Sequence, residues 1–347
     1  MALMSHAPAL SLVIPVYNEA QSLDELWNEI AQVARDRLYD LEAVFVDDGS
    51  RDGSWDRVAQ LAARDPRVRG VRFRRNFGKA AALSAGFRAA RGRVILTLDA
   101  DLQDDPRELP RFVEALEKGF DVVSGWKQVR HDPWHKVYPS RVFNAMVSGL
   151  TGVRLHDHNC GMKCYRREVV DEVHLYGELH RFVPVLAAGR GWRVGEIVIQ
   201  HRPRKHGSSK YGVWRFVKGF LDLLTVKLIV GYGQRPAHVF GAAGLLTFGV
   251  ALLGLAWLTA SWVLSRLFTN VEDVHLHTRA LFYYSITGLV VGAQFIAIGF
   301  LAELINARTH RESDGYGVAE RCGEPAAPEP SAPEAGSARP TSTSGGL

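Results

Sequence analysis

Two long apolar segments near the C-terminal end constrain the fold of this chain more than any other feature. Val239–Leu264 and Ala280–Leu301 contain no Asp, Glu, Lys or Arg. A helix rises about 1.5 Å per residue, so each segment is long enough to cross the roughly 30 Å hydrocarbon core of a bilayer. A pair of buried core helices is the alternative, but helices this long and apolar on all sides are rare in soluble domains. We therefore predict two transmembrane helices, at about 239–264 and 280–305, within a membrane region of residues 236–306.

The polar flanks of these segments indicate how the chain lies in the membrane. An even number of spans leaves the N-terminal part and the tail on one side, and both carry Lys and Arg, among them Arg308 and Arg311. By the positive-inside rule that side is cytoplasmic, which predicts a multi-pass protein of the cytoplasmic (inner) membrane. Residues 211–235 mix aromatic residues, leucines and lysines, which predicts amphipathic interfacial helices. Residues 307–347 are predicted to form a disordered cytoplasmic tail, because they are rich in Pro, Ala, Ser and Glu from Cys322 onward.

Residues 1–210 show short apolar strands alternating with amphipathic helices. The expected strands are "LSLVIPV", "LEAVFVD", "VRGVRF", "GRVILTLD" and "FDVVSG", and the expected helices are Ser22–Arg37, Ser54–Arg64, Gly78–Arg91 and Pro106–Lys118. Continuous apolar strands joined by helices predict an α/β fold, with a mostly parallel sheet covered on both faces. Ligands of such sheets bind beyond the carboxyl ends of the strands. The polar residues at those ends are Asn18, Glu19, Asp47, Asp48, Asp99 and Asp101.

The charged and sulfur-containing residues narrow the function classes. There are 42 Lys and Arg against 37 Asp and Glu, a mild excess of +5 that suits anionic lipid or phosphate partners. A dense basic stripe with interleaved aromatic residues is missing, which argues against nucleic-acid binding. Cys160, Cys164 and Cys322 cannot form a disulfide framework, and no second cysteine or histidine cluster completes a zinc site. The first residues do not have the basic and long apolar regions of a signal peptide.

The acidic stretch "TLDADLQDDP" follows an apolar strand and predicts a metal site. Asp99 and Asp101 are spaced so that both carboxylates can point to one side of an extended turn, where they repel each other unless a cation binds. Mg²⁺ and Mn²⁺ prefer oxygen ligands and leave room for substrate phosphates, and Gln103 continues the alternation as a neutral oxygen ligand. Asp104 and Asp105, which precede a proline and a helix, instead fit a helix cap and first-turn charge.

Seven motifs occur in an order that resembles family 2 glycosyltransferases, most of all the polyprenyl-phosphate branch of dolichol-phosphate mannosyltransferase-like enzymes. The motifs are "SLVIPVYNEAQSL", "VFVDDGSRDGS", "FRRNFGKAAALSAGF", "TLDADLQDDP", "NCGMKCYRREVV", "HRFVP" and "RKHGSSKYG". The resemblance covers about residues 10–235, and the two spans resemble the membrane anchor of bacterial members. It implies a GT-A nucleotide-sugar-binding fold over residues 1–210. It also implies metal-dependent, inverting transfer of a single sugar from a UDP- or GDP-linked donor to polyprenyl phosphate, for cell-envelope glycan or glycosylation.

The resemblance further implies which residues bind the nucleotide sugar. Pro15, Tyr17 and Glu19 match the first nucleotide-contacting loop, and Asp48 matches a base- or ribose-binding position. An Asx-turn is the structural alternative for Asp48. Many relatives carry arginine where this chain has Lys127, so the donor contacts at that position differ. The other donor-site candidates are Arg75, Asn76, Lys79, Asp99, Ala100, Arg130 and Arg181.

The implied acceptor, a lipid phosphate, is mostly dianionic near neutral pH and needs cations to hold it. The candidate phosphate-binding residues are Arg202, Arg204, Lys205, Ser209 and Lys210, in a loop directly before the interfacial segment. A basic loop that touches anionic lipid without specificity is the alternative. Asp157 corresponds to a carboxylate proposed as base in this family, with an Asx-turn as the alternative, and Arg202 and Asp101 complete the predicted catalytic set. The flanking His156 and His158 are expected to be surface or hydrogen-bonded residues.

Two other functions fit parts of the sequence. A processive polysaccharide synthase of the same fold would carry a Q-x-x-R-W motif and more spans, whereas this chain has "GRGWRV" and two spans. A catalytically dead, membrane-tethered binding protein would lack the metal carboxylates or the basic loop, and both are present. The predicted partners are a nucleotide sugar, polyprenyl phosphate and the bilayer, and glycines such as Gly241 and Gly244 leave room for packing in a homo-oligomer. The sugar and the base are not readable, because their discrimination depends on a few hydroxyl contacts.

Overall fold

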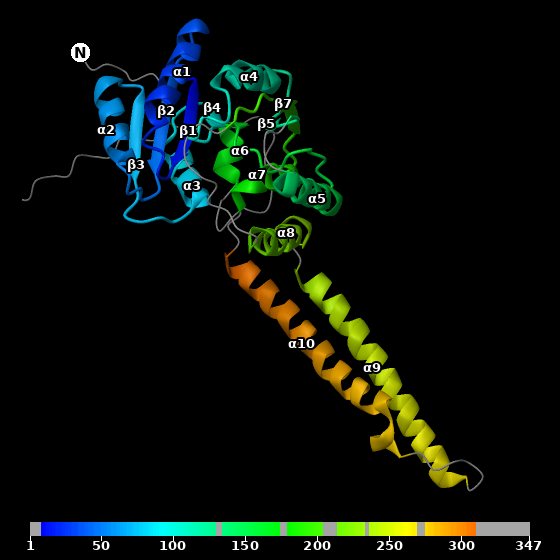
Figure 1. Ribbon diagram of the computed structural model, residues 1–347. Helices are drawn as coiled ribbons and strands as arrows, with labels where there is room; N and C mark the ends of the chain where they lie inside the picture. Colours follow the sequence, from blue (N-terminus) through cyan, green and yellow to red (C-terminus); the bar gives the residue numbers. More distant parts are fainter. Residues whose placement is uncertain are drawn as a thin grey trace, which may run out of the picture.

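A seven-stranded sheet forms the centre of the N-terminal part (Figure 1). The computed structural model describes residues 8–129, 134–173, 179–203, 214–232, 236–268 and 275–309. The strands are β1 (Leu10–Val16), β2 (Leu41–Asp47), β3 (Val68–Arg72), β4 (Val94–Thr97), β5 (Val122–Trp126), β6 (Lys163–Arg166) and β7 (Val194–Val198). Their order across the sheet is β3-β2-β1-β4-β6-β5-β7. β6 runs antiparallel to both of its neighbours, whereas the other six strands share one direction.

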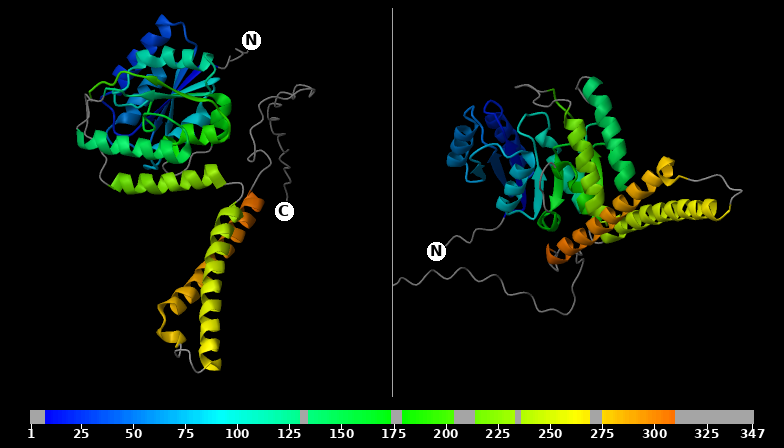
Figure 2. Two further views of the ribbon diagram at one scale, coloured as in Figure 1. Left: turned by 90° about the vertical axis from the view of Figure 1, so that its right-hand side faces the viewer. Right: turned by 90° about the horizontal axis from the view of Figure 1, so that it is seen from below.

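Helices cover both faces of the sheet, which explains why the central strands are apolar on both sides (Figure 2). One face packs against α1 (Leu23–Asp36), α2 (Ser54–Arg64) and α4 (Leu109–Glu117). The other packs against α3 (Lys79–Ala89), α6 (Arg167–Glu172) and α7 (Val183–Gly189). Single-turn 3₁₀ helices lie at Pro106–Glu108, Leu179–Arg181 and Leu276–Thr278.

The two faces of β1 show how the core is divided. Leu12 and Ile14 pack into the cluster that contains Leu26 of α1, and Val13 points to the opposite cluster with α3. Full burial of each such side chain stabilises the fold by about 1.5–3 kcal/mol. A Cβ at Gly86 of α3 would lie 2.2 Å from Val13 Cγ1, so glycine lets this helix lie close against the sheet.

The predicted α/β alternation and the mostly parallel sheet are confirmed. α2 begins and ends at the predicted residues, Ser54 and Arg64. The reversed strand β6 is not evident from the sequence, because a four-residue strand with Lys163 and Arg166 at its ends lacks the apolar run of its neighbours. Its reversal matters for the site, because it brings the beginning of β6 to the edge where the parallel strands end.

Two further helices, α5 (Trp134–Thr151) and α8 (Trp214–Tyr232), pack beyond α7 (Figure 2). Phe143 and Val147 of α5 share an apolar cluster with Leu223 and Val226 of α8. Among the side chains of α8 whose burial the structure describes, five large apolar ones are exposed, namely Phe220, Leu221, Leu224, Leu228 and Ile229. A helix with one packed and one exposed apolar face suits a membrane interface, as predicted for this segment.

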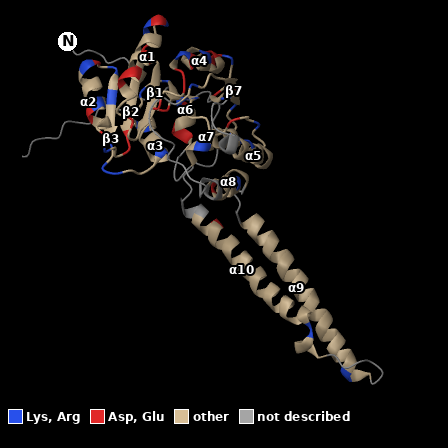
Figure 3. Ribbon diagram, viewed as in Figure 1, with Lys and Arg blue, Asp and Glu red and all other residues tan. Residues whose placement is uncertain are grey.

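The helices α9 (Pro236–Leu267) and α10 (Ala280–Thr309) form an antiparallel pair that projects from the rest of the protein (Figure 1). Figure 3 shows that they are almost free of charged residues along their length. Both are long and apolar enough to cross a membrane, and only 11% of the most apolar stretch of each is buried inside the protein. This exposure differs from that of buried core helices, which were the alternative.

Small residues allow α9 and α10 to pack closely. A Cβ at Gly244 would lie 2.7 Å from the carbonyl oxygen of Gly292, and one at Gly288 would lie 2.8 Å from the Ala251 Cβ. Such backbone approach between glycines is a common way for helices to associate in membranes. Gly244, expected from the sequence to leave room for packing, thus packs inside the helix pair.

Candidate active site

Loops from both halves of the sheet meet at one edge. The strands β1 to β5 end there because they are parallel, and β6 begins there because it is antiparallel. The loops that follow β1, β2 and β4 carry Tyr17, Asp48 and Asp99, and the loop before β6 carries Asp157. The sequence therefore predicts correctly that strand-end residues gather at one edge.

The loop after β4 presents the three predicted metal ligands. Asp101 Oδ1 accepts a hydrogen bond from the backbone N–H of Gln103 at 3.2 Å. Leu102 between them has φ of 60°, in the left-handed region, so the loop turns sharply. Asp99, Asp101 and Gln103 are all half-buried. Their side-chain oxygens therefore lie within reach of a bound ligand.

Asp99 is surrounded by cations. Lys79, the first residue of α3, forms an ion pair with Asp99 through Nζ and Oδ1. Burial alone would raise the pKa of Asp99, but the charges of Lys79, Lys127 and Lys163 hold it below its ordinary value. Behind the carboxylate, a Cβ at Gly161 would lie 2.3 Å from Asp99 Oδ2, so only glycine fits there. Asp99 is therefore ionised and held in place.

A buried ion pair lies beside this loop. Lys127 follows β5, and its Nζ lies 2.5 Å from Asp104 Oδ1, in a pair whose side chains are 15% and 0% exposed. Burial opposes the charge on Lys127, but Asp104 and the other negative groups nearby, Asp99 among them, together outweigh burial and raise the lysine pKa well above its usual range. The cap prediction is confirmed for Asp105, whose Oδ1 accepts from Arg107 N at 2.9 Å. It is wrong for Asp104, because this carboxylate faces inward to Lys127 instead of toward the helix.

Lys163 is a site residue that the sequence analysis misses. It opens β6, is buried, and donates from Nζ to the Cys160 carbonyl oxygen. Burial lowers its pKa, while the nearby charges of Asp99 and Asp157 oppose that shift. A lysine inside the apolar run "GMKCY" is the signal that could have identified it. Cys160 itself is inert, since burial raises its thiol pKa to about 12.

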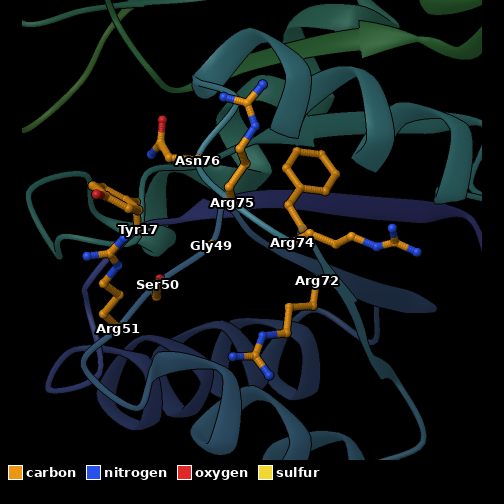
Figure 4. Close-up of a pocket in the computed structure, with 9 residues that line it drawn as sticks. Tyr17, Gly49, Ser50, Arg51, Arg72, Arg74, Arg75 and Asn76 are labelled. Atoms are coloured by element: carbon orange, nitrogen blue, oxygen red, sulfur yellow. The ribbon is translucent and has the colours of Figure 1, made fainter.

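A pocket of about 490 Å³ opens at the ends of β1, β2 and β3 (Figure 4). Tyr17 and Asn76 lie on one side of it, and Arg72 and Arg74 lie on the other. The complete lining is Tyr17, Gly49, Ser50, Arg51, Arg72, Phe73, Arg74, Arg75 and Asn76. An aromatic ring beside several guanidinium groups suits a planar base linked to phosphate. Arg51, Arg72 and Arg74 were not among the predicted site residues, although Arg51 and Arg74 lie within two of the seven quoted motifs.

Asp48 fixes the loop that forms one wall of this pocket. Its Oδ1 accepts from Phe77 N at 2.6 Å, and its Oδ2 accepts from Gly78 N at 2.9 Å. Gly49 has φ of 73°, and a Cβ there would lie 2.5 Å from the Arg75 carbonyl carbon. In this structure Asp48 therefore positions the loop between β3 and α3. A direct contact of Asp48 with the base or ribose stays a prediction.

The first nucleotide-contacting loop is anchored by its backbone. Glu19 N donates to Ser54 Oγ at 2.9 Å. Ser22 Oγ donates to the carbonyl oxygen of Ala100 at 2.6 Å, which links this loop to the metal loop. Pro15 is half-buried within β1, so it holds the strand end next to Tyr17.

Asp157 lies at the same edge and is almost fully buried. Its Oδ1 accepts from Asn159 N at 3.1 Å, so the Asx-turn is present, and the role as base stays a prediction. The His156 ring stacks on the Trp126 ring with 4.0 Å between their centroids. His156 Nδ1 also forms a hydrogen bond with Glu196 Oε1. His158 is buried, which lowers its pKa to about 4. The expectation that both histidines are surface or hydrogen-bonded residues is confirmed.

Arg202, predicted to bind the acceptor phosphate, and Arg181, predicted to bind the donor, contact different elements. Arg202 Nη1 is 2.8 Å from Glu29 Oε2, and its Nη2 is 2.7 Å from Asp105 Oδ1. These contacts hold the metal loop against α1, and a phosphate contact of Arg202 stays a prediction. Arg181 is buried near Gly219 of α8. The donor-site candidate Arg130 lies outside the described residues, and so do the other acceptor candidates, namely Arg204, Lys205, Ser209 and Lys210.

The residues of the loop after β4 fit a divalent metal that binds together with phosphates. Asp99, Asp101 and Gln103 offer only oxygen ligands, as Mg²⁺ and Mn²⁺ prefer. Within the described part of the chain, no group of three or more His, Cys, Asp or Glu could enclose a metal. Two carboxylates and one amide are fewer oxygen ligands than the six that octahedral Mg²⁺ takes, so a metal held there would have further positions for water and phosphate oxygens.

Comparison with known proteins gives this geometry a context. Residues 11–174 match the family described as Glycosyl transferase family 2. Dodecaprenyl-phosphate galacturonate synthase of Rhizobium johnstonii is 38% identical over 88% of this chain and 89% of its own length. Undecaprenyl-phosphate 4-deoxy-4-formamido-L-arabinose transferase of Pseudomonas fluorescens is 37% identical over 85% of this chain and 84% of its own length.

A solved structure shows the same fold over part of the chain. Glucosyl-3-phosphoglycerate synthase of Mycobacterium tuberculosis, in complex with Mn²⁺, UDP and phosphoglyceric acid, superposes with a TM-score of 0.50 at 16% identity. The match covers 64% of this chain and 78% of that chain. At this identity the likeness shows the fold alone.

Proposed function

The chain belongs to glycosyltransferase family 2, and from that membership we propose that it transfers one sugar from a nucleotide sugar to a polyprenyl phosphate at a membrane. One observation supports this proposal more strongly than any other. An oxygen-rich metal loop and an arginine-lined pocket share one sheet edge in a chain that also has two helices long and apolar enough to cross a membrane. The named activities of both relatives join a sugar to a polyprenyl phosphate.

The nucleotide of the donor would bind in the pocket of Figure 4. Tyr17 would stack on the base, and Arg75 would contact the phosphates. Lys79 lies at the start of α3, between this pocket and Asp99. The diphosphate would therefore extend from the pocket toward the loop after β4.

Asp99, Asp101 and Gln103 would hold Mg²⁺ or Mn²⁺. When bound, the metal supplies Lewis-acid stabilisation of the nucleoside diphosphate that leaves. The protein supplies further positive charge through Lys79, which offsets the growing negative charge in the transition state. Gly161 and Gln103 N keep the two carboxylates in place for this task.

The acceptor phosphate would arrive from the membrane side. α8 exposes apolar side chains such as Leu221 and Leu224, and α9 follows it in the chain. The proposed division is a catalytic domain of residues 1–210, interfacial helices at 211–235, two membrane spans within 236–306, and a cytoplasmic tail at 307–347. The catalytic domain would face the cytoplasm of the inner membrane.

In the proposed reaction, an oxygen of the lipid phosphate attacks the anomeric carbon of the sugar. The new bond forms between that carbon and the phosphate oxygen, while the bond to the nucleoside diphosphate breaks on the opposite face. Configuration therefore inverts. A phosphate dianion needs no proton removed before it attacks, so Asp157 would orient the acceptor or the sugar more than act as a strong base.

A transfer assay tests the proposal. Membranes with this protein are mixed with undecaprenyl phosphate, a panel of labelled UDP- and GDP-sugars, and Mg²⁺ or Mn²⁺. Label is expected in the organic phase for one sugar, and EDTA or Asp101→Asn is expected to abolish it. Asp40→Asn, on an exposed loop before β2, is the matched control and should keep full activity. If the nucleotide sugar is bound but no label enters lipid with any polyprenyl phosphate, the acceptor assignment is wrong.

A further inference from the structure

Lys79 connects the two halves of the candidate site. It follows Gly78, whose N–H is held by Asp48 at 2.9 Å, so its position depends on the pocket loop. Its ammonium group contacts Asp99 Oδ1, in the metal loop. The two side chains are 26% and 31% exposed, so this pair lies at the wall of the site, where a ligand can reach it.

The two other lysines near Asp99 are held by buried partners. Lys127 is fixed to Asp104 at 2.5 Å, and its side chain is only 15% exposed. Lys163 donates to the Cys160 carbonyl oxygen inside the protein. Lys79 has a flexible four-carbon stem and the most exposed position of the three, so it is the lysine that can change partners without breaking the core.

The ion pair has a consequence for metal binding. A divalent cation at Asp99 competes with the Lys79 ammonium group for the same carboxylate, and it meets the charges of Lys127 and Lys163 nearby. Like charges within a few ångströms repel strongly when they are partly screened from water. A metal ion without a nucleotide is therefore expected to bind weakly at this site.

The geometry points to Lys79 as a positioning residue that makes metal binding depend on the nucleotide. A nucleoside diphosphate brings negative oxygens that accept the ammonium group, which releases an oxygen of Asp99 for the cation. The nucleotide also offsets the positive charge of the lysines around the site. This inference rests on the proposed function, since the nucleoside diphosphate is the part of the donor that carries those oxygens.

Direct measurement of Mn²⁺ binding tests this role without any turnover. The full chain in detergent is titrated with Mn²⁺, and the free ion is followed by its paramagnetic resonance signal, with and without UDP or GDP. The parent protein is expected to bind Mn²⁺ at least about tenfold more tightly when a nucleotide is present. In Lys79→Met, Mn²⁺ alone should bind at least about tenfold more tightly than in the parent. The gain from the nucleotide should also shrink.

Two matched variants distinguish the effect of losing the Lys79 charge from a nonspecific effect of the substitution on the protein. Lys79→Arg keeps the positive charge and should retain the nucleotide dependence of the parent. Lys118→Met makes the same substitution at the exposed end of α4 and should behave as the parent does. Melting curves of all variants show that the chains compared are folded.

Equal Mn²⁺ affinity of the parent and Lys79→Met without nucleotide would overturn the inference. So would a nucleotide effect that is undiminished in Lys79→Met. Failure of the proposed function has a different signature, because labelled UDP and GDP would both fail to bind the parent in equilibrium dialysis. Tighter binding of Mn²⁺ alone by Lys79→Met would still support the role of Lys79 in that case.

Discussion

Replacing Asp104 with asparagine isolates the contribution of the buried ion pair. The substitution keeps the shape of the side chain but removes its charge, which leaves the Lys127 ammonium group without its carboxylate in a site where only 15% of the side chain is exposed. Removal of one partner from a buried pair costs about 3–5 kcal/mol, because the remaining charge has lost its compensation. Lys127 can relieve part of this cost by turning toward the site, so we expect the lower end of that range.

Thermal melting of the purified protein measures this loss. For a domain of this size, 1 kcal/mol corresponds to about 2–4 °C, so a loss of about 3 kcal/mol should lower the melting temperature of Asp104→Asn by about 6–12 °C relative to the parent. The double variant Asp104→Asn with Lys127→Met removes both charges. It should recover more than half of the decrease in melting temperature that Asp104→Asn causes. Asp40→Asn is exposed and should leave the melting temperature unchanged.

The outcome of the double variant decides the physical interpretation. If Asp104→Asn has the same melting temperature as Asp40→Asn, the ion pair contributes nothing to stability, and the proposed stabilisation by this pair is wrong. If the double variant is no more stable than Asp104→Asn, the loss comes from the hydrogen bonds or shape of the aspartate. The charge of Lys127 is then not its cause.

Three further predictions concern other parts of the chain. Gly161→Ala places a Cβ 2.3 Å from Asp99 Oδ2, so metal-dependent transfer should fall at least about tenfold in a transfer assay while the melting temperature changes little. The pKa of His158 falls from 6.5 to about 4 on folding, so the unfolded chain binds more protons between these values and stability should decline as the pH drops through them. Melting curves at pH 7 and pH 5 should show a smaller decline for His158→Gln than for the parent. Gly292→Val adds side-chain atoms where a Cβ would lie 2.7 Å from Phe248 N, so it should separate α9 from α10. Disulfide formation between cysteines introduced at facing positions of the two helices should therefore fall.

The parts of the fold that repeat a simple pattern could be predicted from the sequence. β1 and β2 are apolar runs followed by amphipathic helices, and α2 has the predicted bounds. The two membrane-length helices follow from length and apolarity alone. Local periodicity is enough in these cases, because each segment carries its own signal.

The site could be predicted only where its residues sit at strand ends. Asp99 and Asp101 follow β4 directly, so their place at the edge of the sheet follows from the chain. Gly161 and Lys163 could not be placed there, because their position depends on the reversed direction of β6. The inward orientation of Asp104 likewise depends on Lys127, which is far away in the sequence and close only in the folded chain.

The close packing of α9 against α10 has a consequence for where the product goes. The backbones at Gly244 and Gly292 approach so closely that no passage remains between the two described helices at that level. Moving a sugar with several hydroxyl groups through hydrocarbon costs several kcal/mol for each polar group left without a partner. If the chain acts as proposed, its glycolipid stays in the leaflet where it is made. Export to the other leaflet then needs a path that this helix pair does not provide at that level, so synthesis and export are distinct steps.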